Sequence, residues 1–133
     1  MSNGIQAKPF RLLSMGKVSR ILGVDRLTIS KAYDRGDFKG YRTPGGWRKI
    51  WCWSVRKHMK DYGVPERFLE NPPRKEDILR PKEAGIMLGV GRTTVNKLID
   101  SGQLEGWRIN TPRKERRTHR EAVQEFLRER ENK

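Results

Sequence analysis

Apolar and polar positions follow one pattern that is written twice along the chain. Residues 22–42 read LGVDRLTISKAYDRGDFKGYR and residues 88–108 read LGVGRTTVNKLIDSGQLEGWR, so the pattern returns 66 positions later without a gap. This spacing is longer than that of the common solenoid repeats and indicates a duplicated small domain. The sequence therefore predicts a flexible arm at residues 1–11, a first unit at 12–65, a linker at 66–79 and a second unit at 80–131.

Each copy predicts two short helices joined at a glycine turn. In the first copy, Val18, Ile21 and Leu22 are spaced as on one face of a helix. The stretch Leu-Gly-Val then makes the turn, because glycine readily takes the positive φ at which helices end. A second helix is expected at 26–35, and its counterpart at 92–101. Their apolar residues share one face and leave basic and amide side chains on the other, which is the layout of a helix-turn-helix.

The pattern after each second helix predicts a β-hairpin. Residues 38–42 and 47–51 alternate apolar and polar positions, as half-buried strands do, on either side of the turn signal Thr-Pro-Gly-Gly. A third helix is expected at 52–62. In the second copy the hairpin is two residues longer, and the closing helix is expected at 120–130. The expected fold class is α+β and mainly helical, with two tandem winged helix-turn-helix domains.

These stretches also carry a family resemblance. The order of helix, LGV-type turn, second helix, F/L-x-G-Y/W-R strand and TPGGWRK resembles the excisionase and MerR-like winged helix-turn-helix, including the BldC-type domains. The first copy is the closer match, with Trp47 where that family often has His. The second copy departs in the wing, where TPRKERR lacks the Gly-Gly tip. The resemblance implies DNA binding, in a transcription regulator, a recombination directionality factor or a phage packaging protein.

Charge narrows the partner to a polyanion. The chain holds 30 Lys and Arg against 16 Asp and Glu, a formal net charge of +14. Double-stranded DNA is preferred to a membrane because the sequence has no long apolar run. It is preferred to RNA because a helix cannot read the deep, narrow major groove of A-form RNA. The N-terminus does not read as a signal peptide and there is a single cysteine, so we expect a cytoplasmic, nucleoid-associated protein.

The second helices and the hairpins hold the candidate DNA contacts. Arginines at the helix starts suit guanine or phosphate, Asn96 suits adenine, and hairpin cations suit a narrow minor groove. For Arg42 and Arg108, a salt bridge within each unit is an equal alternative. The full expected set is Arg26, Leu27, Ser30, Lys31, Arg42, Trp47, Arg48, Lys49, Arg92, Thr93, Asn96, Lys97, Arg108, Arg113, Lys114, Arg116 and Arg117.

Four tryptophans raise the alternative of base stacking on single strands. A core role is the stronger interpretation, because Trp107 occupies the strand position that Tyr41 has in the first copy. Trp47, at the hairpin tip, is the only tryptophan that we expect to be partly exposed.

Catalysis, a cofactor and a metal site are not expected. His58, His119 and Cys52 fail as a metal set in both number and spacing. The sequence shows no Ser/His/Asp arrangement, phosphate-binding glycine loop or inward pair of carboxylates.

Together these features predict a sequence-specific DNA-binding protein. Transcriptional regulation, in a phage or mobile element, is the preferred hypothesis for its role. A monomer would act as an internal pseudo-dimer on two half-sites, and copies could assemble side by side on DNA. The half-sites should differ, because Leu27 and Ser30 in one helix correspond to Thr93 and Asn96 in the other. Recombination directionality or DNA architecture is the competing role. Alternatively, one unit, foremost the second with its altered wing, docks a recombinase, polymerase or terminase.

Overall fold

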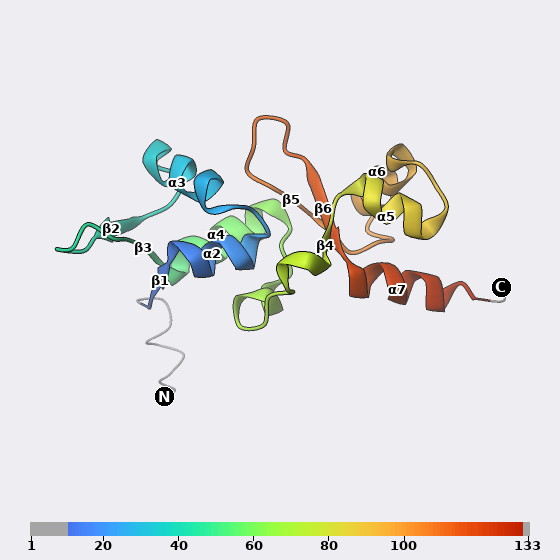
Figure 1. Ribbon diagram of the computed structural model, residues 1–133, viewed down its shortest axis with the longest axis horizontal. Helices are drawn as coiled ribbons and strands as arrows, with labels where there is room; N and C mark the ends of the chain where they lie inside the picture. Colours follow the sequence, from blue (N-terminus) through green and yellow to red (C-terminus); the bar gives the residue numbers. More distant parts are fainter. Residues whose placement is uncertain (1–10, 132–133) are drawn as a thin grey trace.

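The repeated sequence folds into the same elements in the same order (Figure 1). The computed structural model describes residues 11–131, so the arm expected at 1–11 lies outside the described residues except for Arg11. Unit 1 comprises β1 (Leu12–Ser14), α2 (Met15–Leu22), α3 (Arg26–Arg35), β2 (Gly40–Arg42), β3 (Arg48–Trp51), α4 (Cys52–Tyr62) and the 3-10 helix η2 (Glu66–Leu69). Unit 2 comprises the 3-10 helix η3 (Lys75–Asp77), β4 (Ile78–Leu79), α5 (Pro81–Leu88), α6 (Arg92–Asp100), β5 (Trp107–Arg108), β6 (Arg116–His119) and α7 (Arg120–Glu129).

Local sequence sets the helix ends. Ser14 caps α2 by accepting the backbone N–H of Lys17 at 3.1 Å, and Asp25 caps α3 by accepting that of Thr28 at 2.8 Å. The hydrogen bond from Thr28 holds the pKa of Asp25 below its usual range. Gly23 ends α2 with a φ of 72°, a conformation that most other residues rarely adopt. The predicted helix-turn-helix boundaries are therefore confirmed in unit 1.

Each unit contains a three-stranded antiparallel sheet, with strand order β1-β3-β2 in unit 1 and β4-β6-β5 in unit 2. The hairpins were predicted, but β1 and β4 were not, because strands of two or three residues are too short to show an alternating pattern. Two units with helices and a small sheet confirm the expected α+β, mainly helical fold of tandem winged helix-turn-helix type.

The hydrophobic core of unit 1 is completed by residues of unit 2. Trp107 and Ile109, which flank the end of β5, are buried in the same cluster as Ile21 and Ile29 of unit 1. The ring of Phe68, from η2, meets the Trp107 ring edge to face with centroids 5.4 Å apart. Unit 2 keeps a smaller core of its own, made of Leu79, Ala84, Val95, Leu104 and Val123. The two units therefore form one packed body.

The segment expected as a linker belongs to both units. Its first part, η2, buries Phe68 and Leu69 in the core of unit 1. Its last part, β4, pairs with β6 and so forms the third strand of the sheet in unit 2. Residues 66–79 therefore pack as structure along much of their length.

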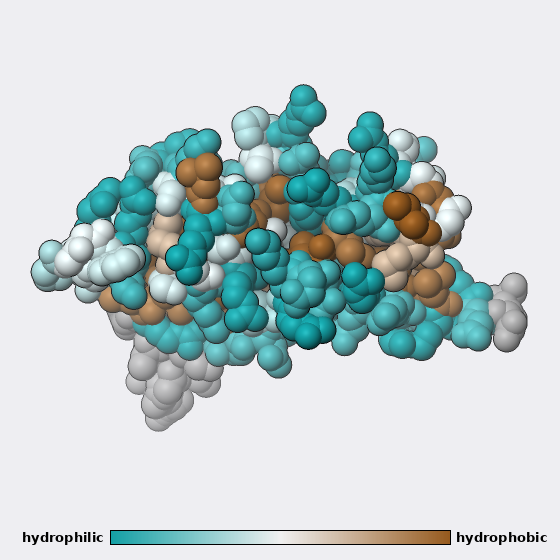
Figure 2. Space-filling model, viewed as in Figure 1, coloured by the Kyte–Doolittle hydropathy of each residue, from teal (hydrophilic) through white to brown (hydrophobic). Residues whose placement is uncertain are grey.

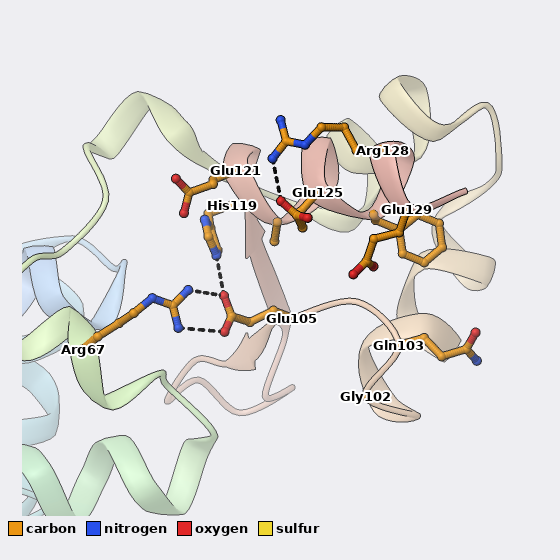
Figure 3. A pocket seen from close by; sticks show the side chains of 11 residues that line it. Arg67, Gly102, Gln103, Glu105, His119, Glu121, Glu125, Arg128 and Glu129 are labelled. Atoms are coloured by element: carbon orange, nitrogen blue, oxygen red, sulfur yellow. Dashed lines mark hydrogen bonds and ion pairs between the residues drawn. The ribbon is translucent and has the colours of Figure 1, made fainter. Parts of the chain in front are cut away.

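Ion pairs seal the contact between the units (Figure 3). Arg67 of unit 1 donates to the carboxylate of Glu105 in unit 2 with an Nη1–Oε2 distance of 2.9 Å, and His119 Nε2 lies 2.8 Å from Glu105 Oε1. The guanidinium of Arg67 holds the pKa of Glu105 below its usual range. On the other side of the contact, Asn110 Nδ2 donates to Asp37 at 2.9 Å. These polar contacts fix the orientation of the two units.

Candidate nucleic-acid interface

The second helices of the two helix-turn-helix units lie on the same side of the molecule. In Figure 1, α3 and α6 both lie along the upper edge, and the hairpin between β5 and β6 rises between them. Figure 2 shows that this edge is mostly hydrophilic, with a few apolar spots. The arrangement places both candidate reading helices where one elongated partner can meet them.

The outer face of α3 carries three of the expected contact residues. Arg26, Leu27 and Lys31 are exposed, whereas Ile29 faces the core. Ser30 is half-buried and accepts a hydrogen bond from Arg48 Nη1 at 3.1 Å. Ser30 is thus held by the hairpin, while Arg26 and Lys31 present their charges to solvent.

The outer face of α6 has the same layout with different chemistry. Arg92, Thr93 and Lys97 are exposed, and Val95 is fully buried. Asn96 is half-buried, and its Oδ1 has no hydrogen-bond partner among the described residues. Buried amide oxygens are normally paired. Because this oxygen is itself buried, the side chain of Asn96 has to turn outward before the oxygen can accept a hydrogen bond from a partner.

Equivalent ion pairs brace each reading helix against its hairpin. Arg48 of β3 lies 3.3 Å from Asp34 of α3, and Arg116 of β6 lies 2.6 Å from Asp100 of α6. The hydrogen bond from Arg116 holds the pKa of Asp100 below its usual range. Arg48 and Arg116, which were expected to enter a minor groove, thus also position α3 and α6, and their contact with DNA stays a prediction.

Arg42 and Arg108 occupy equivalent strand positions and differ in their contacts. Arg108 lies 3.3 Å from the carboxylate of Asp100, which is the salt-bridge alternative. Arg42 is exposed, and the equivalent acid, Asp34, pairs with Arg48 instead. Arg42 therefore remains the better candidate for a DNA contact.

The tryptophans of unit 1 depart from the expectation. Trp47 is 73% exposed at the hairpin tip, as expected, but Trp53 is also 42% exposed and Trp51 is half-buried. The reason is that α4 begins at Cys52, so its helical period turns Val55 inward and leaves Trp53 outside. The expectation of a single exposed tryptophan was wrong. Lys49, on strand β3, is half-buried.

The hairpin of unit 2 packs against unit 1. Ile109 at its base is buried in the core of unit 1, and Lys114 Nζ lies 5.9 Å from the centroid of the Tyr62 ring. Arg113 and Lys114 are exposed. Arg117 is half-buried, and burial lowers its pKa. This hairpin, which is two residues longer than that of unit 1, therefore both packs against unit 1 and exposes basic side chains.

A basic groove runs between the units. It has a volume of about 910 Å³, and its cations outnumber its acids. The cations are Arg20 and Arg26 from unit 1 with Lys75, Arg80 and Arg117 from unit 2, and the acids are Asp25, Glu83 and Glu115. Sequence reasoning missed Arg20 and Arg80, because only the docking of the units brings them to one surface. Among residues 11–131, no cluster of His, Cys, Asp and Glu has the composition of a metal site, and no helix is long and apolar enough to span a bilayer.

Comparison with known protein families identifies the second unit. Residues 78–131, from β4 through α7, match the model of a helix-turn-helix domain. Unit 2 is therefore a helix-turn-helix domain, a class whose partner is DNA. The match falls on unit 2, although the TPGGWRK stretch marked unit 1 as the closer to its family. No curated protein and no solved structure matches the chain.

Proposed function

We propose that this protein, whose second unit is a helix-turn-helix domain, binds double-stranded DNA in a sequence-specific manner and regulates transcription. The observation that carries the proposal is the placement of α3 and α6 on one side of a single packed body, each with an exposed basic face. In this proposal each helix enters a major groove, and the hairpins contact the adjacent backbone.

Fixed docking of the units supports a composite site of fixed length. Successive major grooves on one face of B-DNA lie about 34 Å apart, and half-site spacing follows protein geometry. Because Trp107 and Glu105 lock unit 2 onto unit 1, the spacing between the two half-sites is set by the fold. The protein then binds as a monomer that carries two linked reading helices, α3 and α6.

The two half-sites differ because the reading faces differ. In α3, Arg26 can grip guanine and Leu27 can contact the methyl group of thymine. In α6, Arg92 can grip guanine, and Asn96 can pair with adenine through its amide. Lys31 and Lys97 lie deeper in their helices and suit phosphate oxygens.

The hypothesis that the altered wing of unit 2 docks another protein now has an internal alternative. That hairpin contacts Tyr62 and Asp37 of unit 1 through Lys114 and Asn110. The contact with unit 1 gives this hairpin a reason to differ in sequence from the first hairpin without a partner protein. This supports the assignment of both α3 and α6 to DNA binding.

Selection of bound duplexes from a random library, at two salt concentrations, tests the proposal on the full chain. We expect an extended two-part motif for the wild type. In a variant with Arg92→Ala and Asn96→Ala, the half read by α6 should disappear while the other half remains. Arg128→Gln is the matched control, because Arg128 lies on α7, away from α3 and α6 in Figure 1. The absence of any motif, with affinity falling steeply as salt rises, would contradict sequence-specific regulation.

A further inference from the structure

The basic groove has walls from both units and lies beside the reading helix α3. Unit 1 supplies Arg20, near the end of α2, and Arg26, the first residue of α3. Unit 2 supplies Arg80, just before α5, and Arg117 in β6, the second strand of the hairpin that rises between α3 and α6 (Figure 1). Because neither unit alone has both walls, the groove exists only in the docked protein.

The positive charges of this groove are not neutralised within the fold. Its cations are Arg20, Arg26, Lys75, Arg80 and Arg117. Within residues 11–131, none of these five side chains forms an ion pair. Burial lowers the pKa of Arg117, and the nearby positive charge of Arg80 lowers it further. Unpaired like charges oppose the docking of the units, so the stability of the fold does not explain them.

Two of the three acids in the groove are already engaged as helix caps. Asp25 accepts the backbone N–H of Thr28 at 2.8 Å, at the start of α3. Glu83 accepts the backbone N–H of Arg80 at 2.8 Å, at the start of α5. With five cations against three acids, the groove keeps a net positive charge.

The repeat shows that the duplicated fold does not require these cations. At a spacing of 66 residues, Arg20 corresponds to Ile86 and Arg80 corresponds to Ser14. Ile86 is 76% exposed, Ser14 caps α2, and neither residue lines the groove. Both positions therefore carry a positive charge in the copy that faces the groove and no charge in the copy that does not. The charge belongs to the surface that the docked units make together.

The chemistry of the groove suits phosphate. Four of its five cations are arginines, and a planar guanidinium can donate to two phosphate oxygens at once. Phosphate can come from a DNA backbone or from a free oligophosphate. The position of the groove favours DNA, because the groove starts at α3 and is walled by the hairpin that lies between α3 and α6. A duplex that reaches from α3 to α6 has to cross it.

We propose that the basic groove binds the phosphate backbone of the duplex segment between the two half-sites. The inference rests on the proposed DNA reading by α3 and α6. Between two major grooves on one face of B-DNA lie a minor groove and its two backbones, which are the groups that reach this part of the protein. Phosphate contacts carry no sequence information. The spacer between the half-sites is therefore fixed in length and free in sequence.

Binding of a selected two-part duplex by the full-length chain tests the proposal. In one duplex the spacer phosphates are replaced by uncharged methylphosphonates, and in a control duplex the same number is replaced beyond one half-site. Wild-type affinity should fall on the order of 10-fold for the neutral spacer and stay unchanged for the neutral end.

A variant with Arg20→Gln and Arg80→Gln identifies the side chains that meet the spacer. Both residues are exposed, so the free energy of unfolding should stay near that of the wild type. On the unmodified duplex, the slope of log affinity against log salt should fall by about 2. Neutralising the spacer should then cost this variant little more, because the two changes remove the same contact. Lys57→Gln with Arg128→Gln removes the same charge outside the groove and should behave as the wild type.

Three results would overturn the proposal. The first is wild-type affinity and salt slope in the variant with Arg20→Gln and Arg80→Gln. The second is an equal loss for that variant and the wild type when the spacer is neutralised. The third is tight binding of inorganic tripolyphosphate that the variant loses while it keeps its DNA affinity, which would assign the groove to a free phosphate ligand.

A random-sequence duplex separates the groove from the reading helices. If selection returns no two-part motif, the proposed sequence reading fails, but the phosphate contact can still be measured. On the random duplex the variant with Arg20→Gln and Arg80→Gln should again lower the salt slope by about 2. An unchanged slope there would overturn the groove contact on its own.

Discussion

Trp107 Nε1 lies 3.1 Å from the carbonyl oxygen of Leu22, the last residue of α2 in the other unit. The bond joins the helix-turn-helix turn of unit 1 to strand β5 of unit 2, across 85 positions of sequence. A buried hydrogen bond in an apolar contact gives the docking a defined orientation. The two units should therefore unfold and bind together.

Replacing Trp107 with alanine should uncouple the units. The side chain is almost fully buried, and Trp→Ala in a core costs about 3–5 kcal/mol of unfolding free energy. We expect wild-type protein to unfold in denaturant in one transition and the variant to show two. Trp47→Ala, at the tryptophan that is 73% exposed, should change the unfolding free energy far less and leave a single transition. A single unshifted transition for Trp107→Ala would contradict a shared core.

The rigid docking predicts a strict half-site spacing. Inserting about 5 base pairs between the halves of a selected site turns one half to the opposite face of the duplex. Only one unit can then engage, so affinity should fall by at least about 100-fold. Gel shifts on spacer variants measure this. Equal affinity across spacers would indicate a flexible connection, and Trp107→Ala should approach that behaviour.

Lys97 should contribute through phosphate contact. It is exposed on α6, so Lys97→Ala should weaken binding to all sequences alike and reduce the slope of log affinity against log salt by about 1. Lys57→Ala on α4 is the control and should leave the slope unchanged. Loss of affinity for one sequence only would assign Lys97 to base reading instead.

Asn96 should contribute through base reading. Its Oδ1 is buried without a partner among the described residues, so a rotation of the side chain would bring the amide to an adenine, which offers both a donor and an acceptor. Asn96→Ala should relax the preference at one position of the site by about 1–3 kcal/mol, with an unchanged salt slope. Competition binding against the four base pairs at that position measures the effect.

Local signals explain how much of the fold could be predicted. Caps such as Asp25 and turns such as Gly23 act within a few residues, so the helices were placed to within one residue where these signals occur. The α+β class followed from the same local periods. Whether residues 12–65 and 80–131 behave as separate domains stays a prediction.

The contacts between the units could not be predicted, because they join positions far apart in sequence. Trp107 was expected in a core, which is confirmed, but nothing local indicates that the core belongs to the other unit. Arg48 and Arg116 read as DNA-contacting cations, whereas spatial proximity pairs them with Asp34 and Asp100. The assignment of bases to α3 and α6 stays a prediction.

His58 makes unfolding dependent on pH. It is buried between the rings of Phe38 and Tyr62, and burial lowers its pKa to about 4 from 6.5. Between pH 6.5 and about pH 4, His58 is protonated in the unfolded chain but neutral in the folded protein. The free energy of unfolding therefore falls as the pH falls through this range. The maximum loss is about 3 kcal/mol, at 1.36 kcal/mol per pKa unit.

Denaturant titrations between pH 7 and pH 4 test this dependence. His58→Phe keeps an aromatic ring between Phe38 and Tyr62 and should remove the slope between pH 6.5 and about pH 5. Below about pH 5 the variant should still lose stability, because the pKa of Glu105 is depressed in the folded state and its pairing is lost on protonation. An unchanged slope in His58→Phe would assign the proton uptake to another group.

The shared segment between α4 and α5 also bears on how such a chain can be inherited. A gene break within the codons for residues 70–77 would leave Phe68 with unit 1 and β4 with unit 2, but it would remove Trp107 and Ile109 from the core of unit 1. The first half alone would therefore expose apolar surface that unit 2 covers in the full chain. Because the core of the first copy depends on the second, we expect the two copies to be inherited together.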